Sequence, residues 1–236
     1  MRLLKLLLVL FVCAAGPAVA GPLDDATTAY GKGDYATALR LMRPFAEKGH
    51  AGAQYNLGLM YFHGQGVPQN YATALLWFRR AADQGDADAQ FNIGNMYRDG
   101  LGVPQDYATA VTWYRKAAEK GLVEAQSQLG SMYFNGRGVP QDYIEALSWN
   151  RKAADRGNAI SQLNLASMYF NGRGTPKDNV QAYMWSILAL SRFPASPKEY
   201  RDKAVYFRDQ IAAKMTPAQI AEAQKLAREW KPKPER

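Results

Sequence analysis

"AQYNLGLMYFHGQGVPQNYATALLWFRRAADQG" at residues 53–85 and "AQFNIGNMYRDGLGVPQDYATAVTWYRKAAEKG" at residues 89–121 are nearly the same sequence, and this repetition decides the fold. The pattern returns twice more without insertion or deletion, so that equivalent side chains are separated by 36 residues. The clearest columns are Gln54, Gln90, Gln126 and Gln162; Tyr61, Tyr97, Tyr133 and Tyr169; and Pro68, Pro104, Pro140 and Pro176. A fixed period of this size is typical of a solenoid, in which each unit buries its apolar face only against its neighbours.

Each unit is predicted to contain two helices. Apolar residues recur at helical spacing over residues 53–61 and again over 74–81, whereas the segment between them holds two glycines and a proline. Asn70, which is aspartate in the other copies, is suited to cap the second helix, and Gly85 is suited to end it. The pattern predicts an all-α fold, a right-handed α/α solenoid of antiparallel helix pairs with a 36-residue period.

Glycine recurs inside the first helix of the units. Gly58, Gly94 and Gly130 are equivalent, and only the fourth copy has a larger residue there, Ala166. Glycine inside a helix costs about 1 kcal/mol relative to alanine. Its repetition predicts a close approach of a neighbouring helix at this position.

The sequence also indicates how the array begins and ends. The segment "GDYATALRLMRPFAEKG" matches only the second half of a unit, and after Trp185 the pattern gives way to two further helical segments. Thr216, Pro217 and Gln219 form a helix-start signal for the last segment. We therefore divide the chain into a signal peptide (1–20), a partial capping repeat (21–50), four repeats (51–190), a helical cap (191–230) and a flexible tail (231–236).

The amino terminus is typical of a secretory signal. Arg2 and Lys5 are followed by a short apolar run, and small residues lead to Ala20, after which we expect cleavage. A lipid anchor on Cys13 is disfavoured because Leu10, Phe11 and Val12 precede it. We expect an exported chain, periplasmic or secreted, with no integral membrane span.

Composition excludes several classes of chemistry. The single cysteine lies in the leader, so the processed chain has no disulfide and no thiol nucleophile. The formal net charge is +8, and two of these charges belong to the leader. Without a dense Lys/Arg block, the sequence argues against nucleic acid as a partner and favours a monomer with a mixed-charge surface.

The repeated stretch resembles the Sel1-like repeat, an α/α relative of the tetratricopeptide repeat. The resemblance covers about residues 47–190 and nearly every signature position of the repeat. It implies an adaptor that holds a protein or peptide partner in a concave groove. Exported bacterial members of the family are often linked to envelope assembly, signalling or host contact.

The residues needed for catalysis are not grouped in any recognised pattern. His50 and His63 are the only histidines, and no third ligand follows at metal-site spacing. No serine lies in a nucleophile elbow, and the paired glycines of the loops are not followed by a phosphate-binding lysine. We predict no enzyme activity, no cofactor and no metal. A hydrolase of cell-wall or β-lactam-type substrates remains an alternative, because some exported relatives have been credited with such activity.

Two aligned columns invite a binding interpretation. Trp77, Trp113, Trp149 and Trp185 lie on the apolar stripe of the second helix, which predicts core positions. If exposed, they would instead favour a glycan-binding envelope protein. The cations near the ends of the second helices favour a structural role over an anion-binding stripe: Arg79, Arg80, Arg115, Lys116, Arg151 and Lys152.

The variable face of the first helix is the candidate partner site. Positions one turn apart share a helical face, and the first of them carries an amide in every unit, which offers both a donor and an acceptor. We predict a partner-binding groove formed by Asn56, Leu59, His63, Asn92, Asn95, Asp99, Gln128, Ser131, Asn135, Asn164, Ser167 and Asn171. A purely structural role for these amides stays open as the alternative.

Overall fold

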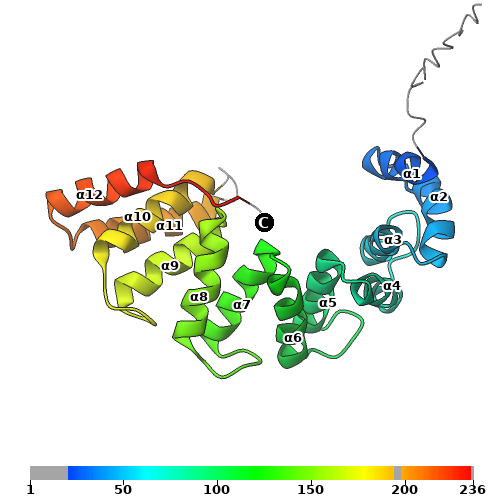
Figure 1. The fold of residues 1–236 in the computed structure, drawn as a ribbon, viewed down its shortest axis with the longest axis horizontal. Coiled ribbons are helices and arrows are strands. Elements are labelled where there is room, and N and C mark those ends of the chain that lie inside the picture. Colours follow the sequence, from blue (N-terminus) through cyan, green and yellow to red (C-terminus); the bar gives the residue numbers. More distant parts are fainter. Residues whose placement is uncertain (1–20, 194–197, 235–236) are drawn as a thin grey trace, which may run out of the picture.

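The computed structural model describes residues 21–193 and 198–234, which form helices joined by short loops into a curved array (Figure 1). The predicted signal peptide lies outside these residues. The helices are α1 (Pro22–Gly31), α2 (Tyr35–Glu47), α3 (Ala51–His63), α4 (Tyr71–Asp83), α5 (Ala87–Asp99), α6 (Tyr107–Glu119), α7 (Val123–Asn135), α8 (Tyr143–Asp155), α9 (Ala159–Asn171), α10 (Asn179–Arg192), α11 (Lys198–Ala212) and α12 (Pro217–Glu229). The predicted all-α solenoid is confirmed.

The core lies between units as well as within them. Each first helix packs on its own second helix, as α3 does on α4, and each second helix also packs on the first helix of the next unit, as α4 does on α5. One apolar cluster combines Phe78 from α4 with Ile93 and Met96 from α5, all fully buried. No unit therefore buries its apolar face alone.

The predicted helix starts and stops are confirmed. Asn70 accepts a hydrogen bond from the Thr73 amide at the start of α4, and aspartates take its place before α6, α8 and α10. Gly85 follows α4 with a φ of 90°, in the left-handed region that favours glycine. These local signals fix where each helix begins and ends.

The interior glycines mark a close approach, as predicted, and the neighbour is the unit's own second helix. A Cβ atom placed on Gly58 would lie 2.5 Å from the ring of Phe78, and one on Gly94 would lie 2.6 Å from that of Tyr114. In the fourth unit the first helix has Ala166 instead of glycine. The residue equivalent to Phe78 and Tyr114 on its second helix is Ser186, which is much smaller than either. The first helix therefore carries the smaller residue where its neighbour on the second helix is large, and the larger one where that neighbour is small.

The carboxyl-terminal helices close the array. Thr216 and Gln219 form the reciprocal capping box of α12, and Pro217 follows the cap as predicted. Residues on its apolar face pack on the cluster around Trp185. Beyond α12, Lys233 of the predicted flexible tail is hydrogen-bonded to Asp155 at the end of α8.

The arc has an inner and an outer side. In Figure 1, α3 and α5 lie nearer the inside of the arc than α4 and α6. The first helices α7 and α9 of successive units contact each other. The exposed strip of each first helix therefore faces the inner side, which we call the inner face.

Candidate functional site

The predicted partner-binding residues share this inner face, with a gradient of exposure along each helix. The first and second positions of each unit are half-buried, and the third is exposed. The third positions are His63, Asp99, Asn135 and Asn171. The structure brings the twelve predicted residues onto one face, and their hydrogen bonds divide them into two groups.

Three of the predicted amides bind side chains of other helices, and Asn135 and Asn171 donate to the carbonyls of Ser131 and Ser167 in their own helices. Asn95 Oδ1 accepts a hydrogen bond from the hydroxyl of buried Tyr114 at 2.8 Å. Asn164 Nδ2 donates to Asn150 Oδ1 at 3.0 Å, and Asn92 Nδ2 lies 3.4 Å from the Tyr55 hydroxyl of the preceding first helix. At these positions the amide has the structural role that the sequence left open.

Other inner-face side chains are free to bind a partner. Among the described residues, the side-chain amides of Asn56 and Gln128 have no hydrogen-bonding partner, although both are half-buried. Leu59 and Ser131 lie one turn further along the same two helices. A partner that runs along the inner face meets unpaired donors and acceptors beside an apolar side chain.

One end of the inner face is acidic. Burial raises the pKa of Asp88 above its usual range, and the neighbouring carboxylates Asp86 and Glu124 raise it further. Burial also raises the pKa of the Tyr55 phenol, with Asp88 adding to the effect. Carboxylates that disfavour one another's charge would gain from a cation supplied by a partner.

The tryptophan column is not uniformly core, which corrects the prediction. Trp185 is only 1% exposed, but Trp77, Trp113 and Trp149 are half-buried. Trp185 is covered by the carboxyl-terminal cap, where Trp230 meets its ring edge-on at a centroid distance of 6.2 Å. Each of the other three tryptophans packs on a cluster formed by the preceding unit and the first helix of its own unit, and within the described residues no helix covers its outer side as α12 covers Trp185.

Cations lie over the three half-buried rings. Arg80 Cζ is 4.5 Å from the ring centroid of Trp77, Lys116 Nζ is 4.2 Å from that of Trp113, and Lys152 Nζ is 3.9 Å from that of Trp149. The ring face on which a sugar would stack is therefore occupied. This arrangement gives no support to the glycan-binding alternative.

The second aligned set of cations is structural, as expected. Arg79 and Arg115 donate to the hydroxyls of Tyr97 and Tyr133 on the first helix of the next unit, each at 2.5 Å. Arg151 makes the equivalent bond to Tyr169. These bonds join successive units and explain why the arginine and tyrosine columns repeat together.

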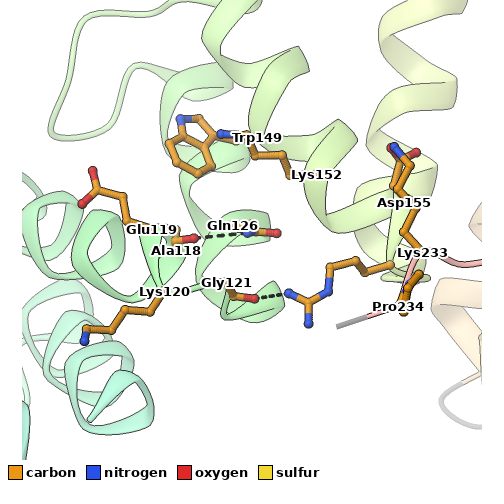
Figure 2. Close-up of a pocket in the computed structure, with 11 residues that line it drawn as sticks. Ala118, Glu119, Lys120, Gly121, Gln126, Trp149, Lys152, Asp155, Lys233 and Pro234 are labelled. Carbon is orange, nitrogen blue, oxygen red and sulfur yellow. Dashed lines mark hydrogen bonds and ion pairs between the residues drawn. The ribbon is translucent and has the colours of Figure 1, made fainter. Parts of the chain in front are cut away.

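A pocket of about 650 Å³ lies beside Trp149, a feature that sequence reasoning missed. Its walls come from the end of α6, the start of α7, the second half of α8 and the tail residues Lys233 and Pro234 (Figure 2). Gln126 contributes a buried side chain whose Oε1 has no hydrogen-bonding partner. The only sequence signal for this pocket was the repetition of its tryptophan and glutamine.

The two histidines do not form a site. His50 accepts a hydrogen bond from the Ala53 amide through Nδ1 at 3.2 Å and so caps α3, whereas His63 is exposed at the other end of that helix. Within residues 21–193 and 198–234, no three His, Cys, Asp or Glu side chains are grouped as metal ligands would be. None of the helices in these ranges is long and apolar enough to cross a membrane.

Comparison with known proteins identifies the repeat. The model of the Sel1 repeat matches residues 29–50, 51–86, 87–122, 123–158 and 159–192. None of the curated proteins matches the sequence. Among solved structures, a Sel1 repeat protein from Oxalobacter formigenes is similar, with 30% identity, a TM-score of 0.69, and coverage of 83% of this chain and 86% of that one.

A second similar structure is a protective antigen present in uropathogenic Escherichia coli strains, which displays an SLR fold. It has 31% identity and a TM-score of 0.72 over 89% of this chain. The match covers 50% of the antigen, so this chain spans about half of that protein's length.

Proposed function

Because this chain belongs to the Sel1 repeat family, whose members are generally protein–protein interaction scaffolds, we propose that it is an exported, non-catalytic adaptor in the bacterial cell envelope. It would bind a protein or peptide partner along its inner face. The observation that carries this proposal is the pair of half-buried, unpaired amides at Asn56 and Gln128. Amides in this state gain hydrogen bonds when an extended or helical segment covers them.

The test is capture of a partner from an envelope extract by residues 21–236. We expect that a Gln128→Arg plus Ser131→Arg variant captures at least about tenfold less partner than the native chain, since two new cations would block the inner face of α7. Asn95 is not a suitable test position, because its substitution would leave the buried Tyr114 hydroxyl without an acceptor. Thermal unfolding followed by circular dichroism should be nearly unchanged in the test variant.

A matched control places the same two charges elsewhere. Thr112→Arg plus Ser148→Arg changes exposed residues of α6 and α8, on second helices rather than the inner face. This variant should capture the partner as the native chain does. Equal capture by all three proteins would show that the inner face is not the binding surface.

A further inference from the structure

The chain's own tail is seated on the side of the solenoid that carries the tryptophans. The backbone amide of Lys233 donates to the Asp155 carbonyl at 2.8 Å, and its Nζ lies 2.6 Å from Asp155 Oδ2. Pro234 lines the same pocket as Trp149, and Figure 2 shows Lys233 and Pro234 beside Asp155. Since Trp230 contacts Trp185, the tail runs from the tryptophan of the fourth unit to Asp155 and the pocket of the third unit.

The preceding units repeat the features that hold the tail. We call this surface the tryptophan edge and define it by Trp77, Trp113 and Trp149 with the acids Asp83, Glu119 and Asp155. Asp155 is paired with Lys233, whereas Asp83 and Glu119 have no ion-pair partner among the described residues. The carboxylates of the first two units are therefore free to accept a cation.

The edge also presents buried acceptors that lack donors. Gln90 Oε1 and Gln126 Oε1 are unpaired, and both side chains are more than nine-tenths buried. In the first unit the equivalent Gln54 Oε1 accepts a hydrogen bond from Gln84 Nε2 at 2.7 Å. That bond shows that a donor arriving along the edge reaches this position, and that the other two acceptors are ready for a donor from a ligand.

We infer that the tryptophan edge is a docking surface for an extended partner segment in which lysine and proline alternate. The tail shows the mode: a lysine ammonium pairs with the acid at the end of a second helix, a backbone amide donates to the last carbonyl, and a proline lines the same pocket as the tryptophan. Alternating prolines hold such a segment extended in advance, which lowers the entropy lost on docking. At Trp113, Asp83 and Glu119 balance the charges of Lys116 and Lys120, so an added lysine is not repelled.

The probe is the peptide fluorescein-WKPKP-amide, which copies residues 230–234 and carries the dye on its amino terminus, so that both lysines stay free. Fluorescence anisotropy with residues 21–236 should show saturable binding, and Glu119→Lys should raise the Kd at least about tenfold. Glu119 is exposed at the end of α6, so this substitution leaves the core intact. A peptide with the second lysine replaced by glutamate should not bind the native chain.

The control is Glu124→Lys, which makes the same charge change at an exposed residue of the inner face and should leave the Kd unchanged. The Gln128→Arg plus Ser131→Arg variant should also bind the peptide normally, which separates this inference from the adaptor proposal. Absence of saturable binding to the native chain would overturn the inference, as would a Glu119→Lys variant that binds the peptide with the same Kd as the native chain. If Asp155→Lys abolished binding and Glu119→Lys did not, the inference would also be overturned, because the peptide would then bind only at the site where the tail docks.

Discussion

Gly138→Ala is expected to lower the free energy of unfolding by about 3–4 kcal/mol, although it adds one methyl group to an exposed loop. Gly138 is the second glycine between α7 and α8, and its φ is 72°. A side chain in this left-handed region costs about 1–2 kcal/mol. A Cβ atom there would also lie 2.3 Å from the carbonyl carbon and oxygen of Tyr107, at the start of the preceding unit's second helix.

The obstacle at Gly138 is backbone, so no rotamer change can relieve it. The loop must move away from α6 and separate two units, and the cost adds to that of the strained φ. Urea unfolding of residues 21–236, followed by circular dichroism, measures the loss. Arg137→Ala, at the exposed residue between the two loop glycines, should change the unfolding free energy by no more than about 0.5 kcal/mol. Similar stability of the two variants would show that this loop does not pack as described.

Gly94→Ala should lower the free energy of unfolding by about 2 kcal/mol, although alanine is intrinsically the better helix former by about 1 kcal/mol. The new methyl would lie 2.6 Å from the ring of Tyr114, which is fully buried and donates to Asn95. Because the ring is held on all sides, it cannot rotate away without losing that hydrogen bond. The measurement is the same urea unfolding experiment.

The chain itself suggests the rescue for Gly94→Ala. Adding Tyr114→Ser recreates the Ala166 and Ser186 pair of the fourth unit, so Gly94→Ala should no longer destabilise when it is measured against Tyr114→Ser alone. As a control, Gly52→Ala should be neutral or stabilising, because the nearest atom to its Cβ is His50 Cε1 at 3.4 Å. If Gly94→Ala destabilised equally in both backgrounds, contact with Tyr114 would not be the reason for the glycine.

The candidate binding surface was only partly predictable. The 36-residue period placed the inner-face positions on equivalent helical turns, and the structure brings them together. The period could not tell Asn95, which accepts from Tyr114, from Gln128, which has no partner. That difference depends on the second helix: Tyr114 donates to Asn95 of its own unit, whereas Asn150, at the equivalent position, bonds to Asn164 of the next unit and leaves Gln128 unpaired.

Periodicity also overstated the burial of the tryptophans. Trp113 and Trp185 occupy equivalent places on their helices, yet Trp185 is buried and Trp113 is not. Burial of this column depends on what lies over it, and α12 and Trp230 pack on the cluster around Trp185 of the last unit. A pattern within one helix cannot report a cover supplied by a helix that begins more than thirty residues further along the chain.

By itself, the sequence determined the repeat, the helix boundaries, the caps and the places where helices approach closely. These features depend on backbone preferences and side-chain size within one unit or between adjacent units, and similar residues recur at the same positions in every copy. Only the tertiary structure decided which inner-face amides are free, which tryptophans are open and where the tail docks. Those outcomes depend on contacts between segments that share no local pattern, so the relevant distances and exposures exist only once the solenoid has folded.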